Sequence, residues 1–373
     1  MKTVCDMDRC TGCMACADSC PKDAIRIEDT LRGYNAVIDA AKCVDCGLCH
    51  HVCQVNHPLE GVQPISWKQG WAENAQVRAE ASSGGFAAAI SREFVRSGGV
   101  VFSCVFQEGK FRFDAAHTPE DTAKFCGSKY VKSDPSGVYP KIRDALKDGK
   151  KVLFIGLPCQ VAAVKKYVSP QLQEKLYAVD LICHGTPSPK VLSRFLEQYH
   201  KPLSAFPTIS FRKKEKKQIF CGNQGVITNG VSDCYTIAFF QGLTQTENCY
   251  RCPYAQLDRI SDLTLGDSWG SELPEETRKK GISLALCQTA KGEALLQEAG
   301  LVLLDVDLEN AIAHNGQLQT PVSRPGKRDW FFRKLQAGGN FNRLIFRCLP
   351  KESSKQAVKA LLIKLKLRDS NIN

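Results

Sequence analysis

The middle of the chain alternates between short apolar runs and segments whose apolar residues recur every three or four positions. Phe86, Ile90 and Phe94 follow the second pattern, and a glycine pair ends it, which predicts a helix. The run VVFSCVF that comes next predicts a buried strand. Residues 138–168 and 176–200 repeat the order of strand, loop and helix. Strands that alternate with helices favour an α/β fold with a mainly parallel sheet.

The first sixty residues have a different character, because cysteines dominate them. CTGCMACADSCP has the spacing C-x2-C-x2-C-x3-C, and CVDCGLCHHVC repeats it. This spacing is typical of an α+β ferredoxin domain with two 4Fe–4S clusters, in which the fourth cysteine of each run binds the cluster of the other run. Zinc sites use two pairs of ligands and do not need a third cysteine at this spacing. The predicted ligands are Cys10, Cys13, Cys16 and Cys53 for one cluster, and Cys43, Cys46, Cys49 and Cys20 for the other.

Two residues depart from this frame. Gln54 follows the last cysteine of the second run, where Pro21 follows the first run, and we expect this change to affect a turn rather than a ligand. Cys5 lies outside the spacing and is expected to be a spare thiol. A domain of this kind transfers single electrons, so the rest of the chain must supply a catalyst or a docking surface.

Four later cysteines suggest a third metal site. Cys159 and Cys183 each follow the end of a predicted strand, and Cys249 and Cys252 form a C-x2-C pair in NCYRC. Ligands of open α/β sheets bind at the carboxyl ends of the strands. If those strands are neighbours, the four thiols can hold a third 4Fe–4S cluster. A structural zinc could use the same thiolates, whereas a thioredoxin-type dithiol is disfavoured because Pro253 and a polar stretch follow the pair.

The remaining cysteines are expected to be buried apolar residues, as free cysteines commonly are. They are Cys104, Cys126, Cys221, Cys234, Cys287 and Cys348.

Composition narrows the setting of this chemistry. The length of 373 residues suits two or three domains. The segment MKTVCDMDRC lacks the apolar run of a secretory signal, and no run of apolar residues is long enough to span a membrane. We therefore expect a cytoplasmic protein whose nineteen cysteines are reduced and include metal ligands. The net charge of +11 suits nucleic acid, a membrane surface or acidic redox partners, and does not choose among them.

The basic residues gather in three places. Residues 210–217 and 323–334 are expected to be solvated surface, although either could steer an acidic partner or a phosphorylated substrate. No signature of a nucleic-acid-binding fold accompanies them, so nucleic acid binding is not expected. The segment KQAVKALLIKLKLR near the C-terminus is amphipathic and basic. It is expected to be a packed helix, or else to contact a membrane or a partner.

Several loops could bind a phosphate-bearing cofactor. A flavin can exchange electrons singly or in pairs, and would therefore link the clusters to hydride chemistry. No G-x-G-x-x-G motif follows a predicted strand, so a Rossmann-type site is not indicated. SSGG and HGTPS open predicted helices, GSKY supplies a lysine, and LGDSWG ends a predicted strand. A helix cap or a turn would explain each of these loops alone.

Taken in order, SSGG, GSKY, GLPCQ, CHGTPSP, NCYRC, SDLTLGDSWG and KGISL resemble the coenzyme F420 hydrogenase/dehydrogenase beta subunit family over residues 75 to 335. The resemblance implies an α/β flavoprotein domain with a 4Fe–4S cluster near the flavin. The implied flavin is FAD, and FMN is the less favoured alternative. The family spans several substrates, so the resemblance does not identify this chain's substrate. The flavin contacts that it implies are Ser82, Ser83, Gly84, Gly85, Ser128, Lys129, His184, Gly185, Thr186, Gly266 and Asp267.

These observations predict an iron–sulfur flavoprotein oxidoreductase whose flavin exchanges hydride with a small-molecule or deazaflavin-like substrate. The alternative is an electron-transfer subunit that feeds a separate catalytic partner. His184 and Lys129 are the polar residues nearest the predicted flavin, and no residue is assigned as catalytic. The expected divisions are a ferredoxin domain at 1–60, a linker at 61–74, an oxidoreductase domain at 75–335 with parts at 75–150 and 151–335, and a basic amphipathic tail at 336–373.

Overall fold

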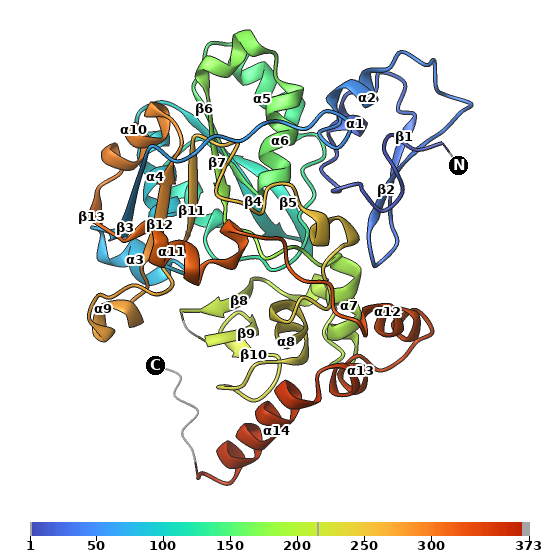
Figure 1. Ribbon diagram of the computed structural model, residues 1–373, viewed down its shortest axis with the longest axis vertical. Coiled ribbons are helices and arrows are strands. Elements are labelled where there is room, and N and C mark those ends of the chain that lie inside the picture. The colour runs from blue at the N-terminus through green and yellow to red at the C-terminus, as the bar shows by residue number, and fades with distance from the viewer. Residues whose placement is uncertain (1, 215, 368–373) are drawn as a thin grey trace.

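The N-terminal unit carries both cysteine runs. The computed structural model describes residues 2–214 and 216–367. In this unit β1 (Ile25–Asp29) pairs in antiparallel register with β2 (Tyr34–Ile38). The short helices α1 (Ala15–Asp18) and α2 (Leu48–Val52) each contain the third cysteine of a run. Figure 1 shows the unit, in blue, beside α5 and α6 of the large domain.

A mixed sheet organises the large domain. Within the described residues it has eight strands in the order β13-β3-β12-β11-β7-β6-β4-β5. The four adjacent strands β11, β7, β6 and β4 are parallel to one another, and five of the eight strands run in one direction. The α/β class is thereby confirmed. The bounds are β3 Ser66–Ala72, β4 Val100–Gln107, β5 Lys110–Ala116, β6 Val152–Gly156, β7 Leu176–Leu181, β11 Leu263–Asp267, β12 Ser283–Cys287 and β13 Leu301–Leu304.

Helices cover both faces of this sheet, because alternate residues of a strand point to opposite sides. In β6, Val152 and Phe154 pack in the core that contains α5 (Val138–Lys147) and α6 (Pro158–Tyr167). Leu153 and Ile155 pack on the other side, in the core that contains α4 and α10. The latter helices span Phe86–Arg96 and Ala290–Glu298.

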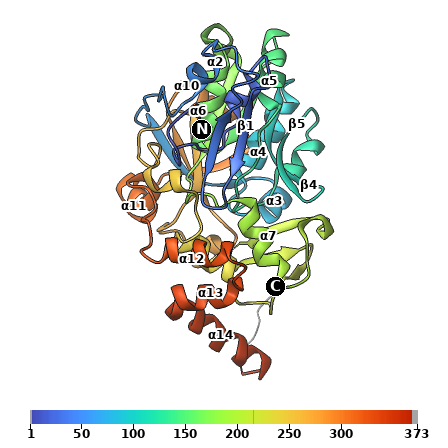
Figure 2. The same cartoon turned by 90° about the vertical axis from the view of Figure 1, so that its right-hand side faces the viewer.

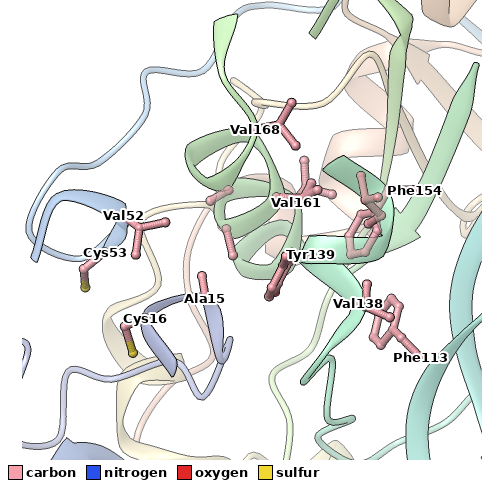
Figure 3. Packing of buried hydrophobic residues seen from close by; sticks show 14 of the residues in the cluster. Ala15, Cys16, Val52, Cys53, Phe113, Val138, Tyr139, Phe154, Val161 and Val168 are labelled. Carbon is pink, nitrogen blue, oxygen red and sulfur yellow. The ribbon is translucent and has the colours of Figure 1, made fainter. Parts of the chain in front are cut away.

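Helix α6 lies between the sheet and the ferredoxin unit. Val161, Ala162, Ala163 and Val164 are all fully buried, as expected for a helix that has apolar neighbours on every side. Figure 3 shows α6 with the ferredoxin side chains of α1 and α2, including Val52, on one side and the sheet side chains on the other. One continuous core therefore joins the cysteine-rich unit to the sheet.

A second layer lies below the large sheet in Figures 1 and 2. Its small antiparallel sheet packs with four helices around a separate aromatic core that includes Phe195, Phe211, Phe331 and Phe341. The elements are β8 Ile209–Lys213, β9 Lys216–Cys221, β10 Gln224–Gly225, α7 Pro189–Glu197, α8 Cys234–Phe240, α12 Arg328–Gln336 and α13 Phe341–Cys348.

Two of the expected divisions need correction. Ser66–Ala72 was expected in a linker but forms β3, which pairs with β12 and β13 inside the large sheet. The expected tail at 336–373 contains the whole of α13, whose apolar face is buried in the aromatic core. Within the described part of that tail, α14 (Pro350–Lys364) is the segment that extends away from the body, as Figures 1 and 2 show. The other domain boundaries stay predictions.

The remaining helices are α3 Ala75–Glu80, α9 Glu275–Lys279 and α11 Leu308–His314. Among the described residues, no helix combines the length and the apolar character that crossing a bilayer requires.

Candidate functional site

The outer thiolate set consists of Cys20, Cys43, Cys46 and Cys49. All four line one hollow of about 120 Å³ in the ferredoxin unit. Cys46 is exposed and the other three are partly buried. The structure therefore brings Cys20 of the first run to the three leading cysteines of the second, which is the exchange that the spacing predicts.

The middle thiolate set consists of Cys10, Cys13, Cys16 and Cys53. Burial and then the neighbouring Cys10 thiolate raise the pKa of Cys13 to about 12. The pKa of Cys16 is also raised, by burial first and then by Cys13, Cys10 and Cys53, so the four thiols lie close together. Cys5 is not remote from this set, because interactions with Cys10 and Cys53, followed by burial, raise the pKa of its thiol.

The inner thiolate set consists of Cys159, Cys183, Cys249 and Cys252. Strands β6 and β7 are parallel neighbours, so the cysteines that follow them meet at one edge of the sheet. Burial, and then the thiolates of the other three, raise the pKa of Cys183. Cys249 lies in a 3-10 turn, where the Thr246 Oγ1 is 3.3 Å from its Sγ.

The three sets fit iron–sulfur clusters in number and kind of donor. Each supplies four thiolates, which is the usual ligand set of a 4Fe–4S cube. Within the described residues, no three His, Cys, Asp or Glu side chains converge as the ligands of a single metal ion would. The thiolates of a cube bind four different irons, so a cube does not require that convergence.

Gln54 joins the middle and inner sets. Its Nε2 donates to Thr11 Oγ1 at 2.8 Å and to the carbonyl oxygen of Cys159 at 3.3 Å. Its Oε1 accepts a hydrogen bond from the hydroxyl of Tyr254, two residues after Cys252. Gln54 therefore does more than shape a turn, while the expectation that the change does not concern a ligand stays a prediction.

Lys132 is a buried cation between the same two sets. Its side-chain Nζ is 3.7 Å from Cys159 Sγ, and the residue is 3% exposed. Burial alone would lower its pKa, but the thiolates of Cys159, Cys249, Cys183 and Cys13, in decreasing order of effect, raise it. Lys132 was not predicted from the sequence, because a lysine between a valine and a serine carries no local signal of such contacts.

A cavity of about 520 Å³ adjoins the inner set, within the usual size range for a ligand site. Ten of the eleven predicted flavin contacts line it, and so does Cys183. Gly84 does not line it, because it packs against the sheet. A Cβ at Gly84 would lie 2.3 Å from the carbonyl oxygen of Gly70 and 2.6 Å from the backbone nitrogen of Ser283. Cys104 and Cys126 also line the cavity and are only partly buried, whereas they were expected to be core residues.

Cations from the first basic segment enter this cavity. Arg212 is buried and makes two contacts of 2.5 and 3.2 Å with the carboxylate of Asp267. The Nζ of Lys217 lies 4.2 Å from the ring centre of Phe240 and 4.9 Å from that of Trp269. The expectation of a solvated surface was therefore wrong for Arg212 and Lys217, both of which line the cavity.

Three predicted contacts differ in their freedom to bind a ligand. The Nζ of Lys129 donates to the carbonyl oxygens of Phe125 and Cys126, at 2.7 and 3.0 Å, and burial lowers its pKa. Burial, then Lys217, lowers the pKa of His184, which favours the neutral imidazole. The hydroxyl of Thr186 is buried and has no hydrogen-bond partner among the described residues, so it suits a polar atom of a bound molecule.

Two family models match the chain. Residues 149–303 match the model for the C-terminal part of the coenzyme F420 hydrogenase/dehydrogenase beta subunit, and residues 9–57 match a 4Fe–4S dicluster domain. The resemblance to the beta subunit family is thereby confirmed over residues 149–303, and the cysteine-rich segment is confirmed as a 4Fe–4S dicluster domain.

Solved structures add a distant likeness. A chain of the F420-reducing NiFe hydrogenase complex from Methanosarcina barkeri is 18% identical, with a TM-score of 0.48, over 68% of this chain and 90% of that chain. No curated protein matches the chain.

A buried ion-pair network holds the cysteine loop of the beta-subunit domain. Arg328, which is fully buried, donates to Glu247 Oε2 at 2.7 Å and to the backbone carbonyl of Arg32 at 2.8 Å. Arg324 also pairs with Glu247, at 2.9 Å. The second basic segment is therefore not simply solvated surface. It ties the turn that contains Cys249 to the ferredoxin hairpin.

Proposed function

We propose that the protein is a flavin-dependent iron–sulfur oxidoreductase with a third 4Fe–4S cluster. The proposed ligands of that cluster are the inner thiolate set, and the proposed flavin site is the adjoining cavity. FAD is the proposed cofactor, with FMN as the smaller alternative. The observation that carries the proposal is the position of Cys183, which belongs to the inner thiolates and also lines the cavity.

A flavin bound there would supply the exchange between one-electron and two-electron chemistry. The chain's own residues suit an anionic, phosphate-bearing molecule. Among the described lining residues, the carboxylate of Asp267 is offset by Arg212, so Lys129 and Lys217 supply the positive charge of the cavity. Thr186 offers a hydroxyl without a partner in the part of the chain that the structure describes. The surrounding aromatic rings, such as Phe240 and Trp269, provide flat apolar surface for a ring system.

The proposed reaction is hydride exchange with a small molecule, in which deazaflavin-like compounds are one class to test. A second candidate function is electron transfer to a separate catalytic partner, without substrate chemistry in this chain. The exposure of Cys46 in the outer set favours contact with a redox protein in either case.

Metal and flavin analysis tests the proposal. Anaerobically purified protein should contain about twelve irons, with matching sulfide, and one flavin per chain. The double variant Cys249→Ala, Cys252→Ala should contain about eight irons. The matched control is Cys221→Ala, Cys234→Ala, which removes two cysteines outside all three sets and should keep all the iron. Eight irons in the unaltered protein, with no flavin, would reject the proposal.

Turnover separates the two candidate functions. Reduction of the flavin by a hydride donor with the isolated chain supports the enzyme. Flavin that is reduced only when a redox protein is added supports the electron-transfer subunit.

Helix α14 is the proposed site of peripheral contact with a membrane or a partner. Val358, Leu361 and Leu365 are exposed at positions that share one side of the helix, and lysines flank them. We also propose a cytoplasmic location, since all nineteen cysteines are free thiols.

A further inference from the structure

The contact between the ferredoxin unit and the inner thiolates contains one buried cation whose surroundings are unusual. The groups that raise the pKa of Lys132 are all cysteine thiolates, and no carboxylate is among them. Its backbone N–H donates to the carbonyl oxygen of Pro187 at 2.9 Å, in the loop that follows Cys183. The main chain therefore fixes the residue beside the inner set.

The charge of Lys132 does not act equally on the two thiolate sets. Its Nζ is 3.7 Å from Cys159 Sγ in the inner set. Cys13 of the middle set raises the pKa of Lys132 less than any of the three inner thiolates does. The charge of Lys132 therefore interacts more strongly with the inner set than with Cys13. A 4Fe–4S cluster gains one negative charge when it is reduced. A nearby positive charge therefore stabilises the reduced form, and charge and hydrogen bonds to sulfur are known to set the potentials of such clusters.

We propose that Lys132 is a positioning residue for electron transfer, which raises the reduction potential of the inner cluster above that of the middle cluster. This inference rests on the proposed function, because it requires the third cluster. In the step concerned, one electron would leave the reduced middle cluster and enter the oxidised inner cluster, with no proton transferred. The ammonium favours the state in which the electron is on the inner cluster.

Redox titration followed by electron paramagnetic resonance tests the inference. The inner-cluster signal is the component that is absent from the Cys249→Ala, Cys252→Ala protein. Lys132→Met removes the charge and keeps a similar chain length, Lys132→Arg keeps the charge, and Lys165→Met is the matched control. Lys165 is also a lysine with a largely buried side chain, but its Nζ donates to the carbonyl oxygen of Ile260 at 2.7 Å and no thiolate acts on its pKa.

In Lys132→Met the ratio of reduced to oxidised inner cluster, at a fixed ambient potential, should fall at least tenfold. That change is about 59 mV for a one-electron couple. Lys132→Arg should restore most of the shift, and Lys165→Met should leave the potential unchanged.

Two results would overturn the inference: an unchanged potential in Lys132→Met, or an equal shift in Lys132→Arg, which would indicate altered packing rather than lost charge. If Lys132→Met does not assemble the inner cluster, Lys132→Gln is titrated by the same criteria. Failure of the proposed function is distinguishable, because the unaltered protein would then contain only eight irons and no inner-cluster signal.

Discussion

Replacing Gln54 with alanine should loosen the contact between the ferredoxin unit and the inner thiolate set. The side chain is 2% exposed and makes three hydrogen bonds, to Thr11, to the Cys159 carbonyl and from Tyr254. Alanine removes all three. The hydroxyls of Thr11 and Tyr254 would then lose a partner in a site where both residues are buried.

The size of the effect follows from those two buried hydroxyls. A buried polar group without a partner costs about 1–3 kcal/mol. Two such groups, one of which can turn toward another acceptor, give an expected loss of about 2–4 kcal/mol in the free energy of opening this contact. A loss of 2 kcal/mol accelerates exchange that proceeds through this opening by about 30-fold.

Amide hydrogen exchange measures that opening directly. Peptides around Cys159 and Tyr254 should exchange about 30-fold faster or more in Gln54→Ala, whereas peptides from β6 should not change. Asn56→Ala is the matched control. It removes a hydrogen bond of 2.8 Å to Val4, which lies within the ferredoxin unit, and should not affect the peptides at the contact. Exchange within threefold of the unaltered protein in both junction peptides would refute the bridging role of Gln54.

Three further outcomes are expected. Thr186→Val should weaken binding of added FAD to flavin-free protein about five- to tenfold, as expected for one lost hydrogen bond. It should not lower the melting temperature of the flavin-free protein. Equal affinity of the two proteins for FAD in a fluorescence titration would contradict this prediction. Burial, then Arg78 and Arg212, lower the pKa of Lys214 to about 8 from 10.5. Between these two values the unfolded chain binds more protons than the folded chain, so the free energy of unfolding should gain a component that rises with pH from about 8 to 10.5. Urea unfolding measured at several pH values should show that the free energy of unfolding rises less steeply with pH in Lys214→Met. Vesicles with anionic lipid should sediment the protein in low salt, neutral vesicles should not, and Leu361→Glu, Leu365→Glu should remain in the supernatant.

The cysteine arrangement could be predicted because it depends on local spacing and on strand order. The spacing of the two runs is enough to predict their ligand sets. The inner set needed one further condition, that β6 and β7 be neighbours, and the parallel pairing of Val152 with Leu176 satisfies it. The loops that line the cavity were also predictable, because they follow strands or open helices at the same edge of the sheet.

The residues that were missed act through partners far away in the sequence. The buried Arg212 pairs with Asp267, which lies on a strand of the other layer. Arg328 pairs in the same way with Glu247. Their segments are basic and polar, so their composition resembles that of a surface. The strand at Ser66–Ala72 was missed because Gly70 and a lysine interrupt its apolar pattern.

The contacts between the thiolate sets place them in the order outer, middle, inner, with the cavity next to the inner set. The outer and middle sets meet through Cys49, whose charge acts on Cys16. Gln54 and Lys132 connect the middle and inner sets, and Cys183 connects the inner set to the cavity. Of the twelve predicted ligands, all within the described residues, only Cys46 is exposed. A redox protein can therefore approach closest at the outer set, while a small molecule has the cavity at the opposite end. In the proposed function, electrons exchanged between the two ends would cross the contact that Lys132 and Gln54 form, so substitutions there should slow electron transfer without altering binding at either end.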